Sequence, residues 1–313
     1  MLESVLHLPG PQVVEADLES EPAWVRAGGG IAMTGDLDRQ LGRAVTLLAS
    51  AESLLITAGA GIGIDSGLPD FRGEAGFWRA YPALAECGLQ FQDLASPRQF
   101  ESNPRRAWGF YGHRLSLYRR TRPHAGFGAL LGMARRLSGG GFVFTSNVDG
   151  QFQLAGFSPE AIYECNGSIH WLQCLQDCSG EIWPAVGFEP QTDETRCELL
   201  SDLPHCPQCG AIARPNILMF NDPAWNERRA LKQRAALNAW IEAAGRPVVI
   251  ELGAGTATPT VRALGDRARE RLIRINPAEP WVPDSSAVSL PLGALEAVSR
   301  LSGLLQDGRQ GSP

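Results

Sequence analysis

Residues 53–73 read SLLITAGAGIGIDSGLPDFRG, and this stretch decides the fold class. A short apolar run of strand length ends in Gly59, Gly61 and Gly63. Glycines directly after a strand let backbone N–H groups and a helix N-terminus approach a pyrophosphate. The stretch therefore predicts the first strand and turn of a nucleotide-binding α/β domain.

The next residues depart from a plain dinucleotide-binding unit. Such a unit continues into a second strand that ends in Asp or Glu about 20 residues on. Residues 74–88 instead read EAGFWRAYPALAECG, which contains no such strand. Between the glycine turn and this stretch lie Pro69, Asp70, Phe71 and Arg72. They would bring an acid, an aromatic face and a cation to the phosphates. This arrangement suits a reaction on the cofactor itself.

Apolar runs of strand length alternate with segments long enough for helices, which predicts an α/β fold with a doubly wound, Rossmann-like parallel sheet. A helical pattern starts at residues 36–37, and an amphipathic helix is expected over 293–305. Residues 1–36 read as an irregular extension, 37–305 as the catalytic domain and 306–313 as a polar tail. The further strands are expected at 141–147, 161–165, 215–220, 247–253, 271–276 and 286–290.

Composition excludes several classes of protein. The 313 residues carry a formal charge of −6 with scattered arginines, so a direct nucleic-acid ligand is not expected. No apolar run is long enough to span a bilayer, and the start lacks a signal-peptide pattern, so we expect a cytoplasmic protein without a membrane partner. The only lysine is Lys232, which excludes a Walker-type phosphate lysine. Oligomeric state is left open.

Four cysteines have the spacing of a structural zinc site. Cys174 and Cys178 form C-x3-C, and Cys206 and Cys209 form C-x2-C after 27 intervening residues. Four thiolates suit a closed, tetrahedral Zn²⁺ site that lets a core-poor insert fold. We predict an inserted zinc module at about 166–214; the alternative is four free cysteines. Cys165 and Cys197 are the candidates if one ligand is misassigned, and Cys87 is expected to be buried.

The strand at 141–147 ends TSNVDG, which delivers Asn147 and Asp149 to the carboxyl edge of the predicted sheet. Open α/β sheets bind ligands at this edge. A carboxamide ligand needs one donor and one acceptor, which this pair supplies. The alternative is that both residues simply form a turn.

The motifs GAGIGIDSGLPDFRG, TSNVD, CNGS, the paired cysteines, RPNILMF and RIN occur in one order. This series, with the helical segment SPRQFESNPRRAWGFY, resembles the sirtuins, the NAD-consuming protein deacylases, over residues 37–305. The resemblance implies a Rossmann-like domain, a small zinc domain, and a cleft between them for NAD and an acylated lysine of a protein or peptide. The enzyme family transfers the acyl group to ADP-ribose and releases nicotinamide.

Carried over by position, the resemblance implies roles for individual residues. The phosphates would lie against Ala58, Gly59, Ala60 and Gly61, with Gly253 and Gly255 nearby. Asp70, Phe71 and Arg72 would flank the nicotinamide and its ribose, and Asn147 with Asp149 would bind the carboxamide. Asn276 would bind the adenosine ribose, Phe220 would lie in the loop that pairs with the substrate backbone, and Cys174, Cys178, Cys206 and Cys209 would hold structural zinc.

The sequence departs from the family at one catalytic position. Sirtuins have a His-Gly pair where this chain has Asn166-Gly167. An amide cannot remove a proton near neutrality, and losing a general base typically costs about 10²–10⁴ in rate. A weakened deacylase, an ADP-ribosyltransferase or NAD hydrolase, and an NAD-binding or ADP-ribose-binding sensor all remain open. His170 is a candidate substitute base. Smaller departures are Gly63, Ser146, Phe152 and Asn221-Asp222.

Tyr111 and Arg114 form a Y-x-x-R pair in the helical segment. The spacing puts both side chains on one helix face. In sirtuins that prefer succinyl or malonyl lysine, such a pair holds the acyl carboxylate, so the resemblance implies a preference for acidic acyl groups. The alternative is two amphipathic residues on a half-buried helix.

Overall fold

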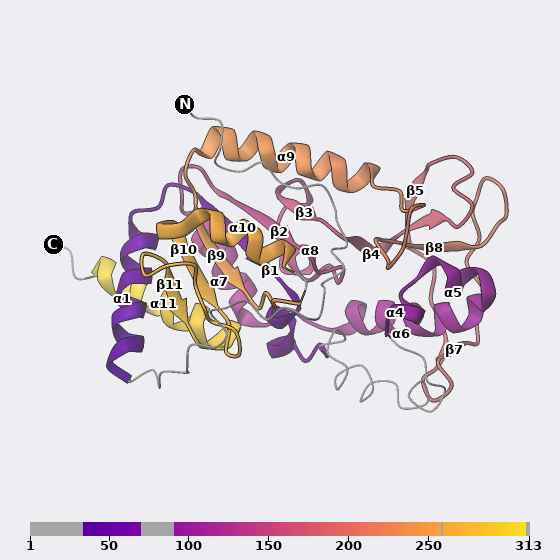
Figure 1. Ribbon diagram of the computed structural model, residues 1–313, viewed down its shortest axis with the longest axis horizontal. Helices are drawn as coiled ribbons and strands as arrows, with labels where there is room; N and C mark the ends of the chain where they lie inside the picture. The colour runs from indigo at the N-terminus through magenta and orange to yellow at the C-terminus, as the bar shows by residue number, and fades with distance from the viewer. Residues whose placement is uncertain (1–33, 70–90, 258, 311–313) are drawn as a thin grey trace.

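The computed structural model describes residues 34–69, 91–257 and 259–310, and Figure 1 shows two lobes along its longest axis. The larger lobe holds a parallel sheet with helices on both faces. The smaller lobe holds short strands and three helices from an earlier part of the chain. Within the described ranges, no helix is both long and apolar enough to cross a membrane.

The large sheet has the order β11-β10-β9-β1-β2-β3, and all its neighbouring strands run parallel. Read from β3, this is the 3-2-1-4-5-6 order of dinucleotide-binding folds, which confirms the predicted fold class. The order reverses between β1 and β9, and ligands bind outside the carboxyl ends of the strands at that point. The strands are β1 (Leu54–Ala58), β2 (Gly141–Thr145), β3 (Ile162–Glu164), β9 (Val248–Leu252), β10 (Leu272–Ile275) and β11 (Val288–Leu290).

Both faces of this sheet are covered, because alternate side chains of each strand enter different cores. Leu54 and Ile56 of β1 pack into one core, and Leu55 packs into the other. The first core lies under α1 (Thr34–Ala49), α7 (Ala125–Arg135) and α11 (Ala294–Gln310). The second lies under α9 (Arg228–Ala244) and α10 (Thr260–Ala268). Short helical turns are η1 (Ala60–Ser66), α8 (Gln151–Leu154), η2 (Pro159–Ala161) and η3 (Arg269–Arg271).

The small lobe has a core of its own, built from two separate parts of the chain. One part is helical: α4 (Phe91–Leu94), α5 (Pro97–Ser102) and α6 (Pro104–Arg120). The other holds an antiparallel sheet of β5 (Ile182–Pro184), β4 (Gly167–Cys174) and β8 (Ala213–Ile217), and the hairpin of β6 (Thr192–Asp193) with β7 (Glu198–Leu199). The indole N–H of Trp108 donates to the Ala213 carbonyl at 2.9 Å and ties the two parts together.

Local sequence explains where α6 begins. The side chain of Asn103 accepts a hydrogen bond from the Arg106 N–H at 3.1 Å, and Pro104 occupies the first turn. An Asn cap followed by Pro is a standard start signal, since both satisfy or remove free N–H groups. This start positions Tyr111 and Arg114 on a helix of the small lobe.

The structure corrects four boundaries expected from the sequence. The segment 215–220 was expected among the strands of the parallel sheet, but β8 pairs antiparallel with β4 in the small lobe. The small lobe extends past residue 214 and also recruits 91–120. Helix α1 begins at Thr34, inside the predicted extension, and α11 continues to Gln310, inside the predicted tail. Apolar periodicity cannot distinguish which sheet a strand joins, and polar ends of surface helices resemble tails.

The passage between the lobes requires glycine at position 167. Gly167 has φ +79, and a Cβ there would lie 2.1 Å from the Asn216 carbonyl oxygen. We expect Gly167→Ala to reduce the free energy of unfolding by at least about 2 kcal/mol, because both the left-handed backbone and the contact are unfavourable. Gly42→Ala is the matched control: Gly42 lies inside α1, and a Cβ there would meet nothing within 4 Å. That change should stabilise by about 0.5–1 kcal/mol in urea unfolding. A Gly167→Ala protein as stable as wild type would contradict this account.

Candidate active site

The glycine turn after β1 packs directly on the turn after β9. A Cβ on Gly59 would lie 2.6 Å from the Gly253 carbonyl oxygen, and a Cβ on Gly61 would lie 2.7 Å from the Gly253 Cα. The N–H groups of Gly59 and Gly61 donate to the carbonyls of Leu252 and Gly253, both at 3.0 Å. These amides therefore hold the two turns together at the strand-order reversal, and the glycines are required for this close approach.

Asn147 reaches the same turn from the end of β2. Its Nδ2–H donates to the Gly59 carbonyl at 3.0 Å, and its backbone N–H donates to Thr145 Oγ1 at 3.0 Å. Asp149 is also buried, and its Oδ1 accepts the Gln151 N–H at 2.9 Å. The structure thus brings both residues to the carboxyl edge of the sheet, as the sequence predicted. The Asn147 carboxamide contacts the glycine turn, and the Asp149 carboxylate lies two residues further along the same loop.

Asn166 lies exactly where the chain leaves the large sheet for the small lobe. Its Nδ2–H donates to the Ser146 carbonyl at 3.2 Å, and its own carbonyl accepts the Leu218 N–H at 2.9 Å. The side chain is half-buried. It can orient a neighbouring group through its amide oxygen, but it has no basic nitrogen.

His170 has a structural partner that occupies one of its two ring nitrogens. Its Nε2 lies 2.9 Å from the Asp149 carbonyl oxygen. A carbonyl can only accept, so Nε2 carries the proton and donates it there. His170 therefore stabilises the loop that presents Asp149.

Burial lowers the pKa of His170 below its ordinary value of 6.5. As pH falls below 6.5, the unfolded chain takes up the proton before the folded protein does. The contribution of neutral His170 to the free energy of unfolding should therefore be complete above pH 6.5 and be lost as the pH falls through the folded-state pKa. We expect His170→Gln, which keeps a donor for Asp149, to reduce the loss of unfolding free energy between about pH 7.5 and about pH 5.5. Urea titrations at both pH values measure this, and equal losses in the two proteins would contradict it.

The predicted ribose residue Asn276 is engaged by its own loop. Its Oδ1 accepts the N–H groups of Ala278 and Glu279, each at 2.9 Å, and its Nδ2–H donates to the Ala254 carbonyl at 3.0 Å. Asn276 thereby fixes the segment after β10 against the turn after β9. Gly255 lies in that turn, and a Cβ there would be 3.6 Å from Glu279 Oε2.

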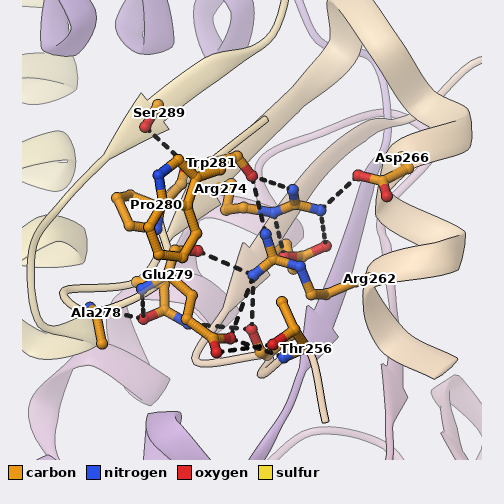
Figure 2. Close-up of polar contacts among 12 residues, drawn as sticks. Thr256, Arg262, Asp266, Arg274, Ala278, Glu279, Pro280, Trp281 and Ser289 are labelled. Carbon is orange, nitrogen blue, oxygen red and sulfur yellow. Dashed lines mark hydrogen bonds and ion pairs between the residues drawn. The ribbon is translucent and has the colours of Figure 1, made fainter. Parts of the chain in front are cut away.

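Glu279 is a residue of this edge that the sequence analysis missed. Figure 2 shows its carboxylate accepting from the Thr256 N–H at 2.7 Å and from the Thr256 hydroxyl at 2.9 Å. Arg262 supports this contact, since it donates to the carbonyls of Ala254 and Glu279 at 3.1 and 2.9 Å. The available signal was an acid four residues past the end of β10, at the edge of the sheet where the glycine turns meet.

A buried ion network lies behind this loop. Arg274 donates to both oxygens of Glu251, at 2.5 and 3.0 Å, and to Asp266 at 2.7 Å (Figure 2). Arg274 and Arg262 also both donate to the Trp281 carbonyl. Burial raises the pKa of Glu251, and the adjacent guanidinium opposes that shift. Breaking one partner of such a pair would leave a buried charge uncompensated.

The sequence-predicted Tyr111 and Arg114 are neighbours, but the phenol that Arg114 binds belongs to Tyr118. The guanidinium carbon of Arg114 lies 5.7 Å from the Tyr111 ring centre and 5.4 Å from that of Tyr118. Its Nη2 and Nε donate to the Tyr118 hydroxyl at 2.8 and 3.1 Å. Burial raises the pKa of Tyr111 to about 12, so this phenol stays protonated. Tyr118, one turn further on, is a second missed residue.

Phe220 lies beside α4, and its backbone N–H is already used. Its N–H donates to the Ala95 carbonyl at 2.9 Å, and its ring meets that of Phe91 edge-on at 5.9 Å. A peptide strand therefore cannot pair with this amide without displacing the Ala95 carbonyl. The predicted residues Asp70, Phe71 and Arg72 lie outside the described residues, as does Cys87.

The four predicted cysteines gather at one point of the small lobe. Their sulfur atoms all lie within 4.8 Å of one another, with 3.7 Å between Cys174 and Cys209 and 3.6 Å between Cys178 and Cys206. Tetrahedral zinc with Zn–S bonds of about 2.3 Å places sulfurs roughly 3.8 Å apart. The geometry and donor set fit a structural Zn²⁺. The two leftover candidates, Cys165 and Cys197, are buried elsewhere.

Fold and site together define a class: a Rossmann-like α/β protein with a cysteine-clustered lobe next to its ligand-binding edge. The comparisons then identify the family. The Sir2 family model matches residues 59–241, more than half of the chain, and this protein belongs to the Sir2 family.

Relatives and solved structures agree with this assignment. An NAD-dependent protein deacylase of Thermococcus kodakarensis is 31% identical over 204 residues, which cover 63% of this chain and 70% of that protein. The mitochondrial NAD-dependent protein deacylase sirtuin-5 of Canis lupus familiaris is 31% identical over 196 residues, 57% of this chain and 60% of that protein. A Sir2 homologue in complex with ADP-ribose, itself a His-to-Asn mutant, shares the fold with a TM-score of 0.64 at 23% identity, covering 86% of this chain and 98% of that one.

Proposed function

We propose that this protein is an NAD-dependent protein lysine deacylase. It would transfer an acyl group from a lysine side chain to ADP-ribose and release nicotinamide. The observation that carries the proposal is the bond from Asn147 to the Gly59 carbonyl at the strand-order reversal, next to Ser146, which Asn166 binds at the passage to the small lobe. The relatives named as NAD-dependent protein deacylases support the same reaction.

Each residue of this edge has a task in the proposed reaction. The Asn147 amide and the Asp149 carboxylate orient the nicotinamide carboxamide, so that the departing ring is fixed against the ribose. The turns at Gly61 and Gly253 give the phosphates room, because no side chain projects from either. Glu279 and Asn276 shape the wall that receives the adenosine ribose. Asp70, Phe71 and Arg72 would complete the pocket around the nicotinamide and its ribose.

Asn166 limits the second half of the reaction. Nicotinamide departure depends on positioning and electrostatics, which an amide can support. The later step needs a ribose hydroxyl to lose its proton, and Asn166 cannot accept it. The second candidate function is therefore NAD cleavage without acyl transfer, as an NAD hydrolase or ADP-ribosyltransferase. The bond from Asn166 to the Ser146 carbonyl favours this alternative, since it fixes at this position an amide group that has no basic nitrogen. A non-enzymatic NAD or ADP-ribose sensor is the third.

Product analysis separates these functions. The protein is incubated with NAD and acetyl-lysine or succinyl-lysine peptides, and the products are measured by mass spectrometry. O-acyl-ADP-ribose that depends on the peptide is the expected product. If nicotinamide and either free ADP-ribose or ADP-ribosylated protein form to the same extent without peptide, the protein is an NAD hydrolase or ADP-ribosyltransferase and not a deacylase. If calorimetry shows saturable NAD binding and no product forms, the protein is a non-enzymatic sensor.

Arg114 gives the proposal a test of acyl preference. If its guanidinium binds an acyl carboxylate, Arg114→Gln should lower kcat/KM for succinyl-lysine peptide by about 10–100-fold, because hydrogen bonds to charged groups are worth about 1.5–3 kcal/mol. Acetyl-lysine turnover should change little. Arg120→Gln, an exposed residue on the same helix, is the control. Equal losses for both peptides in Arg114→Gln would reject a role in acyl selection.

A further inference from the structure

A second pocket lies at the opposite end of the large sheet from the candidate active site. It has a volume of about 530 Å³ and is lined by the residues that lead into β9 and β10. Arg246 and Pro247 precede β9, and Arg269, Glu270 and Arg271 precede β10. The candidate active site uses the carboxyl ends of the strands, so the two sites are separated by the length of the sheet.

The pocket has an apolar base and a cationic rim. Pro247 and Val249 are buried and form part of the lining. Four arginines contribute to the rim against two acids: Arg246, Arg267, Arg269 and Arg271 against Asp266 and Glu270.

Both acids already have partners. Asp266 accepts from Arg274 at 2.7 Å, which lies outside the pocket lining, and Glu270 pairs with Arg246. The pairing of Arg269 with Asp284 is long, at 3.9 Å, and both side chains are solvated. Among the residues that line the pocket, four arginines thus face two carboxylates, while Asp284 and Glu52 lie outside the lining.

Arg271 is the centre of this imbalance. Its Nε donates to the Pro247 carbonyl at 3.2 Å, which fixes the plane of the guanidinium. Among the described residues, no carboxylate forms an ion pair with it. Burial and the nearby charge of Arg246 lower the pKa of Arg271, while Glu270 and Glu52 partly offset them. Arg271 is half-buried and Arg246 is exposed, and an anion between two such like charges lowers their repulsion.

The backbone beside Arg271 is also unusual. Arg269 adopts φ +47, a conformation that a non-glycine residue rarely takes. Strained residues of this kind gather at ligand sites, where the surrounding structure holds them in place. The same turn carries Glu270 and Arg271 to the pocket.

We propose that this pocket binds a small organic phosphate, with its apolar body against Pro247 and Val249 and its phosphate between Arg246 and Arg271. A guanidinium fork matches the oxygens of a phosphate and stays charged at every physiological pH. The volume lies within the range of small-molecule sites, about 300–1,000 Å³. This site is independent of the proposed deacylase reaction.

Binding of 1-naphthyl phosphate, followed by its fluorescence, tests the proposal. We expect one saturable equivalent that remains in the presence of excess ADP-ribose and weakens with added salt. Arg271→Gln should weaken binding at least about tenfold, since one charge-assisted pair is lost. Arg246→Gln, at an exposed position, should weaken it in the same direction. Arg300→Gln, an exposed arginine of α11 paired with Glu296, should leave it unchanged.

Two further ligands decide the chemistry. Neutral 1-naphthol should bind much more weakly than the phosphate, and 1-naphthoate should also bind more weakly. Equal binding of either compound would overturn the phosphate assignment. Absence of saturable binding, or an unchanged isotherm in the folded Arg271→Gln and Arg246→Gln proteins, would overturn the site itself. Melting curves of each variant establish that it is folded.

Discussion

Cys206→Ser should yield a protein without stoichiometric zinc and with an unfolded small lobe. Cys206 is buried, and its sulfur lies 3.6 Å from that of Cys178. The binding free energy of a structural zinc site is about 10–16 kcal/mol in isolated zinc-binding peptides, which matches or exceeds the total stability of a typical domain, about 5–15 kcal/mol. The core of the lobe contains none of the four cysteines, so its packing does not replace this contribution around them. Metal analysis and limited proteolysis of residues 167–217 measure the two effects.

Cys197→Ser is the matched control for this prediction. Cys197 is equally buried in the small lobe, but it lies outside the cysteine cluster. Its replacement should keep one zinc per chain, even if the buried hydroxyl lowers stability. Full zinc content and wild-type proteolysis in Cys206→Ser would contradict the zinc site.

Asn166→His should increase deacylation by about 10²–10⁴-fold, the usual contribution of a positioned general base. Position 166 already lies between the end of β2 and the start of β4, where an imidazole would replace the amide that bonds Ser146. An imidazole titrates near neutrality, so it can take the proton that the amide cannot. The measurement is the rate of peptide deacylation at saturating NAD.

The comparison with Asn166→Ala makes this prediction specific. Alanine removes the bond to the Ser146 carbonyl without introducing a base, so it should be no more active than wild type. If Asn166→His and Asn166→Ala deacylate at the same rate, the general-base account of this position is wrong. If both exceed wild type, the amide hinders the substrate instead.

The sequence predicts the large lobe well, because each of its strands carries a complete local signal. The run 54–58 is apolar except for Thr57, as expected for a strand covered on both faces, and β1 is fully buried. The two cysteine pairs likewise predict that all four sulfur atoms lie together, because both spacings suit ligands of one tetrahedral zinc ion. Features that a short stretch of sequence or a ligand spacing determines can therefore be predicted without the structure.

Features that depend on the packing of distant segments could not be predicted. The helical segment 91–120 joins the small lobe through contacts such as the bond from Trp108 to Ala213, which no periodicity records. Arg114 donates to the Tyr118 hydroxyl, a contact that depends on side-chain rotamers and that the Y-x-x-R spacing does not predict. Glu279 accepts a hydrogen bond from Thr256 of another loop, and the Phe220 N–H donates to the Ala95 carbonyl. Both contacts join segments that are distant in the sequence.

The most direct measurement of the central claim follows the acyl group itself. A peptide with an isotope-labelled acetyl or succinyl lysine is incubated with NAD and the wild-type protein, and the label is located by mass spectrometry. Our account predicts that label leaves the lysine and appears on ADP-ribose in the same amount as nicotinamide is released. Nicotinamide released while all of the label stays on the peptide would contradict it.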